Sequence, residues 1–265
     1  MSKSKPEFSE EELGRFETFR KIIERLRGPG GCPWDRKQTH VSLKRYLVEE
    51  CYEVLETIDE QRMPALGEEL GDLWLQIMLH AQIARELGEF TLEDVLHKIN
   101  TKLIYRHPHV FGDEKAKDAE EVLATWEELK EREKPGNFSL LAGVPREMPA
   151  LAYSQSVQRR AASVGFDWEK IDDIIEKLVE EVEELKRADG QEQKAREFGD
   201  ILLTLANVAR RMDIDLESAL RQANARFTRR FQFIEDACRE AGTDLKALTL
   251  AEMDKLWDEA KNVVG

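Results

Sequence analysis

The chain has 265 residues, with 40 Lys and Arg against 54 Asp and Glu, and a formal net charge of −14 at pH 7. This negative charge repels phosphate backbones and anionic lipids, so we expect neither nucleic-acid binding nor binding to a membrane surface. The chain contains only 15 Gly and 8 Pro, too few turn-forming residues for a β-sandwich or barrel. We therefore expect an all-α protein.

Cysteine usage and hydropathy indicate the compartment. Cys32, Cys51 and Cys238 are far apart and odd in number, which favours neither a disulfide framework nor a zinc ribbon. The N-terminus has no apolar segment of the kind found in secretory signals. No apolar run approaches the roughly 18 residues that a membrane span needs. These features predict a soluble, cytoplasmic protein.

Helix-start and helix-stop signals recur along the chain. Ser9 followed by Glu12 predicts a capping box, as does Thr249 followed by Glu252, and Gly88 predicts the end of a long helix. The loop GPGGCPWD (28–35) predicts a break after the first helix. The helices expected in chain order cover about 9–27, 42–60, 64–87, 91–107, 118–133, 171–185, 194–211, 216–241 and 249 onward.

The two halves of the chain share five sequence blocks in the same order, which indicates an internal duplication. The matching blocks are GCPWD (31–35) with GFDWE (165–169), EECYE (49–53) with EEVEE (180–184), EELGDLW (68–74) with REFGDIL (196–202), NTKLIYR (100–106) with NARFTRR (224–230), and WEELK (126–130) with WDEAK (257–261). We predict two tandem repeats of an antiparallel helical bundle, at 1–133 and 148–265, joined by a linker at 134–147.

Carboxylates border the apolar stripe on two successive helices of each half. At about 100° per residue, Glu181 and Glu184 share one flank of the 171–185 helix, with Lys177 between them. On the next helix, Glu197 and Asp200 form a similar pair. The first half repeats the arrangement with Glu50, Glu53, Glu69 and Asp72.

If these helices pack antiparallel, four carboxylates converge at the edge of the core. Anions so close raise one another's pKa unless cations intervene. Ligation by oxygen atoms suits Mg²⁺, or Mn²⁺ in its place, and bound ions can activate water for a phosphoryl displacement. The alternative is that the acids are an ordinary solvated helix face.

Arginines follow the acids along the chain. Arg226, Arg229 and Arg230 lie on the next helix, with Arg226 and Arg230 four residues apart on one face. Guanidinium groups match phosphate oxygens geometrically, so these residues are candidate phosphate ligands. The alternative is salt bridging to nearby acids. Lys102 and Arg106 occupy the corresponding positions in the first half.

Aromatic and histidine residues give weaker signals. Trp257 can stack on a base while Lys261, one turn later, reaches a phosphate; the alternative is a packed interface aromatic residue. For Trp34 and Trp168 we expect that packing role. His107 and His109 have no accompanying Cys or further His. They indicate a turn at the end of a helix rather than a metal site.

These motifs together resemble the MazG nucleoside triphosphate pyrophosphohydrolases over nearly the whole chain. The family signature is Glu-Glu-x-x-Glu, a spacer, then Glu-x-x-Asp, and the blocks GCPWD and YRHPHVF are also typical. The resemblance implies an all-α fold that dimerises, requires Mg²⁺ and cleaves nucleoside triphosphates to the monophosphate and pyrophosphate. It also implies broad base specificity and a house-cleaning or regulatory role in the nucleotide pool.

The resemblance also implies roles for residues of the second half. The metal ligands would be Glu181, Glu184, Glu197 and Asp200, with a second possible site at Glu50, Glu53, Glu69 and Asp72. The nucleotide site would contain Lys177, Glu180, Arg226, Arg229, Arg230, Trp257 and Lys261. Among these, Lys177 and Glu180 are also catalytic candidates together with Glu181, and either glutamate is a candidate general base.

Two departures from the family pattern are visible. Arg196 stands where an acid often precedes the Glu-x-x-Asp glutamate, which leaves a fifth carboxylate in doubt. Arg226 stands where the family often has Lys, which keeps the charge. The family's C-terminal domain is usually taken as the active one, but the first half here keeps all its acids. The sequence therefore leaves the activity of the first half open.

Two other functions compete with this interpretation. One is a more selective relative, such as a dUTP or phosphoribosyl-ATP pyrophosphohydrolase, which competition between nucleotides would distinguish. The other is a non-catalytic helical interaction module whose acids keep the bundle soluble. A module of that kind would show no Mg²⁺-dependent thermal shift with nucleotide present.

Overall fold

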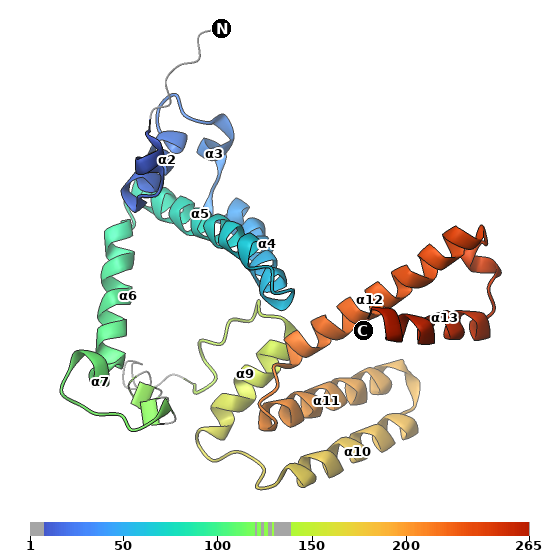
Figure 1. The fold of residues 1–265 in the computed structure, drawn as a ribbon. Helices are drawn as coiled ribbons and strands as arrows, with labels where there is room; N and C mark the ends of the chain where they lie inside the picture. The colour runs from blue at the N-terminus through green and yellow to red at the C-terminus, as the bar shows by residue number, and fades with distance from the viewer. Residues whose placement is uncertain (1–7, 120, 123–124, 127–128, 130–138, 265) are drawn as a thin grey trace. The chain divides into compact units, whose positions relative to one another are not determined.

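The structure is a computed structural model that describes residues 8–119, 121–122, 125–126, 129 and 139–264. The part of the chain that the structure describes contains helices and no strand. The all-α fold class predicted from the sequence is confirmed. The chain divides into two compact units, unit 1 at Met1–Pro135 and unit 2 at Gly136–Gly265 (Figure 1).

Unit 1 is built around one antiparallel pair of long helices, α4 and α5. Its described helices are α1 (Glu10–Leu13), α2 (Phe16–Arg27), α3 (Pro33–Lys37), α4 (His40–Asp59), α5 (Met63–Leu87), α6 (Leu92–Arg106) and α7 (Pro108–Phe111). Helices α2 and α6 pack against α5, and α3 packs against α2. The α4–α5 pair is the element that carries the acidic motifs of the first half.

Apolar residues of three helices form the core of unit 1. Ile23 of α2, Leu43 of α4, and Met78, Leu79 and Ile83 of α5 are each at most 4% exposed. Burying an aliphatic side chain of this size stabilises a fold by about 1.5–3 kcal/mol. This cluster therefore fixes α4 against α5 and holds their acidic flanks in register.

Unit 2 repeats this arrangement with a second antiparallel pair, α10 and α11. Its described helices are α9 (Ala150–Ala162), α10 (Ile171–Arg187), α11 (Gly190–Arg211), α12 (Leu216–Ala241), a 3-10 turn at Leu245–Ala247, and α13 (Leu250–Val263). Helix α9 packs on α11, while α12 packs mainly on α13 and less on α9 and α11. Unit 2 thus contains two helix pairs, α10–α11 and α12–α13.

Local sequence signals set most helix ends. The capping boxes predicted at Ser9 and Thr249 are present, and α5 ends at Gly88, whose φ of 71° lies in the left-handed region that glycine tolerates. The expected first helix is interrupted, however, since α1 ends before Gly14 and α2 begins at Phe16. Glycine is a poor helix former, which explains the break.

Some expectations differ from the structure or fall outside it. Helix α9 was not among the predicted helices, and it begins directly after Pro149. The predicted loop 28–35 includes the start of α3, with Pro33 at its first position. The helix expected over 118–133 lies largely outside the described residues, as do residues 134–138 of the expected linker. No described helix is both long and apolar enough to cross a membrane.

Candidate metal and nucleotide site

The acids of unit 2 meet where α10 packs on α11. Glu181 and Glu184, one turn apart on α10, and Glu197 on α11 each offer a carboxylate oxygen, and these oxygens lie within 4.8 Å of one another. Glu181 is 6% exposed. We call these three residues the unit 2 acid cluster. Three of the four acids that the sequence placed along the two apolar stripes therefore meet where these helices pack.

Lys177 is the cation beside this cluster. Its Nζ lies 2.8 Å from Glu181 and 3.0 Å from Glu180. The hydrogen bond to Glu181, and then that to Glu180, raises the pKa of Lys177 above its usual range. The ammonium therefore stays charged and neutralises part of the acid cluster. Glu180 is more exposed than Glu181 and shares this lysine with it.

Asp200, the fourth predicted ligand, is not a member of the unit 2 acid cluster. It lies one turn after Glu197 on α11, so the two side chains leave the helix on neighbouring positions of one face. In unit 1 the equivalent residue, Asp72, does belong to an acid cluster. The position is therefore within reach of such a cluster in this fold.

The unit 1 acid cluster consists of Glu50 on α4 with Glu69 and Asp72 on α5. Glu53 is hydrogen-bonded to Glu50 but is not one of the three. Burial first, and then the charges of Asp72 and Glu53, raises the pKa of Glu50 above its usual range. The pKa of Glu69 is raised as well, by burial and then by Glu53. Tyr46 stands where unit 2 has Lys177, so no ammonium occupies this position.

Both clusters suit a hard divalent cation. Each presents at least three carboxylate oxygens in a small volume, the donor set that Mg²⁺, Mn²⁺ and Ca²⁺ prefer. The raised pKa of Glu50 shows that its negative charge is poorly compensated by the protein. A bound cation would supply that compensation.

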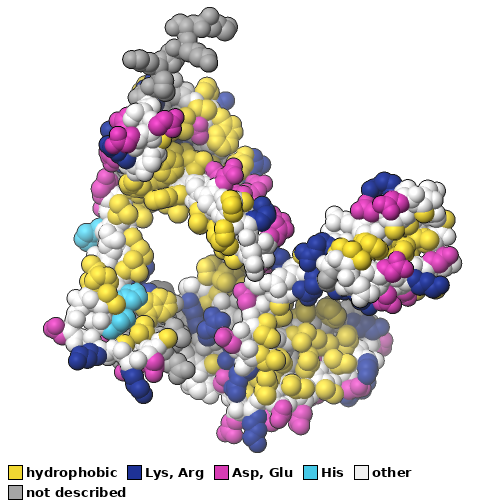
Figure 2. Space-filling view, in the orientation of Figure 1, with side chains coloured by type: hydrophobic (Ala, Val, Ile, Leu, Met, Phe, Trp, Pro, Cys, Tyr) yellow, Lys and Arg dark blue, Asp and Glu magenta, His cyan; other side chains and the backbone are white. Residues whose placement is uncertain are grey.

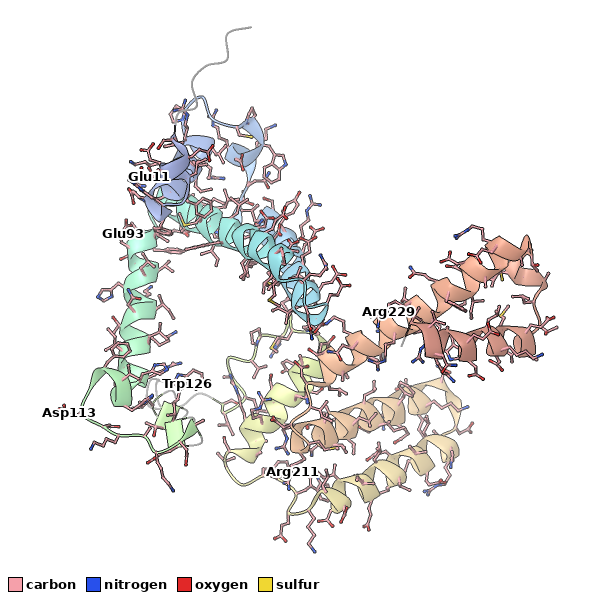
Figure 3. The ribbon with its side chains drawn as sticks, in the orientation of Figure 1. Glu11, Glu93, Asp113, Trp126, Arg211 and Arg229 are labelled. Atoms are coloured by element: carbon pink, nitrogen blue, oxygen red, sulfur yellow. The ribbon has the colours of Figure 1, made fainter. Side chains whose placement is uncertain are left out.

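The predicted phosphate-binding residues lie on α12 and α13. Arg226 and Arg229 are exposed on α12, where Figure 3 labels Arg229. The guanidinium of Arg230 lies 5.5 Å from the centre of the Trp257 ring on α13. The ring of Phe227 lies 5.2 Å from the same tryptophan. Trp257 therefore has an arginine and an aromatic ring as neighbours, and its cation–π contact orients Arg230.

Lys261 has a partner on its own helix, and unit 1 repeats the arginine–tryptophan contact. Lys261 pairs with Asp258 of its own helix at 2.7 Å. In unit 1 the guanidinium of Arg106 lies 5.2 Å from the ring centre of Trp126, at the positions equivalent to Arg230 and Trp257. The duplication seen in the sequence therefore extends to a repeated arginine–tryptophan contact.

The acid cluster of unit 2 and the predicted phosphate-binding cations lie on different helix pairs. The acid cluster lies on the α10–α11 pair, whereas Arg226, Arg229, Arg230 and Lys261 lie on the α12–α13 pair. Sequence periodicity predicted the members of each group. It also placed the two groups on different helices, and the structure adds that these helices pack as two pairs, α10 with α11 and α12 with α13.

A cavity of about 490 Å³ lies beside the GFDWE loop of unit 2, where the sequence predicts no site. Asp167 in this loop pairs with both Arg210 and Arg211. Arg211, labelled in Figure 3, also donates to the backbone oxygens of Trp168 and Glu169. Only the repeated GFDWE block signalled this region. Trp168, expected to be a packing residue, lines the cavity and is 42% exposed.

His107 and His109 lie at the turn between α6 and α7. His107 follows the last residue of α6, and its Nδ1 lies 2.7 Å from the backbone oxygen of Leu103. Neither histidine belongs to the groups of potential metal ligands found among the described residues. The prediction that they form a helix-ending turn agrees with this geometry.

Comparison with known proteins relates this geometry to a family. The family model described as the MazG nucleotide pyrophosphohydrolase domain matches residues 38–111. The nucleoside triphosphate pyrophosphohydrolase/pyrophosphatase MazG of Thermotoga maritima is 45% identical over 93% of this chain and 95% of its own length. The nucleoside triphosphate pyrophosphohydrolase of Escherichia coli K12 is 38% identical over 94% of this chain and 98% of its own length.

Two further matches differ in extent. The uncharacterized protein YabN of Bacillus subtilis is 50% identical over 97% of this chain, which corresponds to 54% of YabN. A crystal structure of a mazG-related protein from Thermotoga maritima is 33% identical and covers 43% of this chain and 98% of that one, with a TM-score of 0.39. The full-length similarity to the Thermotoga maritima MazG protein shows the family: this chain belongs to the MazG family.

Proposed function

We propose that the chain hydrolyses nucleoside triphosphates to nucleoside monophosphates and pyrophosphate, with Mg²⁺ as the metal and Mn²⁺ as a substitute. The observation that carries this proposal is the convergence of Glu181, Glu184 and Glu197 within 4.8 Å, in a chain that also presents an arginine–tryptophan cluster. Family membership supports the same reaction, because the relatives from Thermotoga maritima and Escherichia coli are named for it.

The acid cluster of unit 2 is the proposed metal site. Glu181, Glu184 and Glu197 supply oxygens, and Asp200 completes the set by a change of side-chain rotamer from its place one turn after Glu197. When bound there, the metal supplies a more acidic water and balances charge on the phosphates. Glu180 or Glu181 is the proposed general base. Lys177, which already contacts both glutamates, holds their side chains in place.

The cations of α12 and α13 are the proposed phosphate ligands. Arg226, Arg229 and Arg230 present guanidinium groups, which match phosphate oxygens in a bidentate geometry. Lys261 adds an ammonium one turn after Trp257. Charge develops on the departing pyrophosphate, so cations placed in advance lower the barrier.

The separation of acids and cations supports a homodimer in which one copy faces the other. Large apolar side chains are exposed on the same helices as the acids: Val179 is 58% exposed on α10, and Phe198 is 55% exposed on α11. Figure 2 shows hydrophobic side chains gathered over these two helices. An exposed patch of this kind marks an interface, and a twofold axis would cover it with the same surface of a second copy.

Assembly tests this part of the proposal. We expect wild-type protein to sediment as a dimer and the double variant Val179→Glu, Phe198→Glu to sediment as a monomer. The matched control, Val263→Glu, also changes an exposed apolar residue of unit 2 but lies at the end of α13. A monomeric wild-type chain would remove the dimer from the proposal.

The reaction is tested by a panel of ribo- and deoxyribonucleoside triphosphates assayed for pyrophosphate with Mg²⁺, with Mn²⁺ and with EDTA. We expect broad base use and complete loss of turnover in EDTA. Glu181→Gln should abolish turnover, whereas Glu183→Gln should not, because Glu183 is exposed and pairs with Lys186. Equal activity of Glu181→Gln and wild type would contradict the metal assignment.

The same panel tests the more selective alternatives. A chain that uses only dUTP or only phosphoribosyl-ATP would exclude the proposed house-cleaning role in the cytoplasmic nucleotide pool. The three cysteines are free, which is consistent with a reducing compartment. A chain without hydrolysis or a Mg²⁺-dependent thermal shift would instead be an interaction module.

A further inference from the structure

The cavity beside the GFDWE loop has the size and lining of a site for a planar ring. Its volume of about 490 Å³ lies in the range of small-molecule pockets. Phe166 and Trp168 line it from the loop and are 83% and 42% exposed. Aromatic side chains of this kind stack on any heteroaromatic base, because every base has a π face.

The polar lining has unused hydrogen-bonding capacity. Gln158 of α9, Asn207 and Arg210 of α11, and Asp173 of α10 all line the cavity. Gln158 Oε1 and Arg210 Nε are buried and have no hydrogen-bond partner among the residues that the structure describes. Buried polar atoms usually have such partners. A ligand whose edge carries donors and acceptors would provide them.

The cavity is aligned with the acid cluster along α10. Asp173, Lys177 and Glu181 follow one another at four-residue steps, which keeps them on one face of α10. Eight residues of helix span about 12 Å, so the cavity and the acid cluster lie within the length of a nucleoside triphosphate. On α11, Asn207 and Asp200 lie seven residues apart and also share a face.

Trp257, the residue expected to stack on a base, already has aromatic and cationic neighbours. The Arg230 guanidinium and the Phe227 ring lie 5.5 Å and 5.2 Å from its ring centre. Both neighbours come from α12, and they compete with a base for contact with the Trp257 ring. The cavity on the α10–α11 side offers another aromatic surface.

Unit 1 fills the equivalent place differently. By the alignment of the repeated blocks, Glu24 and Leu79 of unit 1 stand where unit 2 has Gln158 and Asn207. Leu79 is a core residue at 1% exposure, and Glu24 pairs with Arg20 and Arg85. A neutral amide at both positions is thus a property of unit 2, because unit 1 has a paired carboxylate at one of them and a buried leucine at the other.

We propose that this cavity binds the nucleobase of the triphosphate, with the phosphates directed toward the acid cluster of the same α10–α11 pair. The assignment rests on the proposed function, and it names the part of unit 2 that recognises the base. Trp168 and Phe166 stack on the ring, while Gln158 and Asn207 bind its polar edge.

Calorimetry on the full chain separates base binding from phosphate binding. The ligands are the α,β-methylene analogues of ATP, GTP, CTP and UTP, which resist cleavage at the α-phosphorus, and inorganic tripolyphosphate, which has no base; Mg²⁺ is present throughout. We expect Trp168→Ala and Asn207→Leu to weaken binding of the best analogue at least about fivefold, as expected for loss of one base contact. Tripolyphosphate affinity should change less than twofold.

Matched variants keep the test informative. Phe166→Ala removes a ring whose side chain is 83% exposed, so it should preserve the fold and still weaken the analogue. Trp34→Ala removes the equivalent tryptophan of unit 1 and should change neither ligand. Equal weakening of analogue and tripolyphosphate, unchanged binding in every cavity variant, or no analogue binding by wild type would overturn the assignment.

Failure of the proposed function gives a different result. If wild-type protein releases no pyrophosphate but Trp168→Ala still weakens the analogue selectively, the reaction is wrong and the base site stands. If wild-type protein hydrolyses triphosphates while a selective loss appears only in Trp257→Ala, the base lies at α13 and the cavity assignment is wrong.

Discussion

Units 1 and 2 share a helix pair and an acid cluster but differ in how the negative charge is compensated. In unit 2, Lys177 lies 2.8 Å from Glu181. In unit 1, Tyr46 occupies the equivalent position, and burial together with neighbouring acids raises the pKa of Glu50. The change from lysine to tyrosine between the repeats therefore removes an ammonium group that contacts the acid cluster in unit 2.

A second difference concerns what fills the space near each acid cluster. Unit 1 has Leu79 in its core where unit 2 has Asn207 beside a cavity. The family model matches residues 38–111, which lie in unit 1, yet the polar residue at this position lies in unit 2. The match to the family model and the cavity that Asn207 lines thus fall on different halves of one chain.

The largest expected effect separates the two acid clusters directly. We expect Glu181→Gln to lower kcat by more than about 100-fold, because changes outside the ligand shell alone cost about 10–100-fold. Glu50→Gln should cost less than about tenfold if unit 2 performs the reaction. Pyrophosphate release at saturating Mg²⁺ measures both. A greater loss in Glu50→Gln would assign catalysis to unit 1.

A smaller effect is expected for the arginine–tryptophan contacts. Trp257→Ala frees Arg230 from its ring at 5.5 Å, and cation–π contacts contribute about 0.5–2 kcal/mol. We therefore expect KM for triphosphates to rise about tenfold and tripolyphosphate binding to weaken by a similar factor, because the tryptophan acts through a phosphate ligand. Trp126→Ala is the matched variant in unit 1. Equal effects of the two variants would mean that both units bind substrate.

The compensating lysine should alter the response to metal. Lys177→Met leaves the carboxylates of Glu180 and Glu181 facing one another without an ammonium, so Mg²⁺ should raise Tm by a few degrees more than in wild type. Tyr46→Lys introduces the ammonium in unit 1 and should reduce the metal response there. Differential scanning calorimetry with and without Mg²⁺ measures both shifts. An unchanged response in Lys177→Met would show that the lysine does not compensate the cluster.

The sequence predicted those parts of the molecule that depend on neighbours along one helix. Capping boxes at Ser9 and Thr249 and the stop at Gly88 are local, and the i, i+3 spacing of Glu181 and Glu184 sets their common face. The convergence of these residues with Glu197 followed from packing two apolar stripes together. Each of these inferences requires only helical periodicity.

The parts that were not predicted depend on contacts distant in sequence. The cavity is formed where Gln158 of α9, the GFDWE loop and Asn207 of α11 meet, and no local pattern specifies that meeting. Periodicity determines the helix face that carries Asp200 but not its side-chain rotamer, so it could not predict that Asp200 lies outside the acid cluster. The first helix is interrupted at Gly14 because glycine has a low helix propensity. The prediction of one continuous helix gave more weight to the capping box at Ser9.

The smallest expected effect concerns a histidine pair that unit 1 has and unit 2 lacks. His40 at the start of α4 and His80 on α5 lie with their Nδ1 atoms 2.7 Å apart and their rings stacked. Unit 2 has Ile171 and Val208 at these positions. Burial first, and then the neighbouring His40, lowers the pKa of His80. A carboxylate oxygen of Glu89 lies 3.9 Å from His40 Nε2. At this distance it offsets only part of a positive charge on the histidine pair.

The sign of the pH dependence follows from this lowered pKa. Between the unfolded value of about 6.5 and the lower native value, the unfolded chain binds more protons, so stability falls as the pH falls through that window. The double variant His40→Ile, His80→Val carries the residues that unit 2 has at these positions. It should lose the fall in stability that His80 causes at low pH. Melting curves at pH 7.5 and pH 5.5 should show a Tm decrease smaller by one or two degrees in the variant. Identical decreases would mean that the pair titrates alike in the native and unfolded chains.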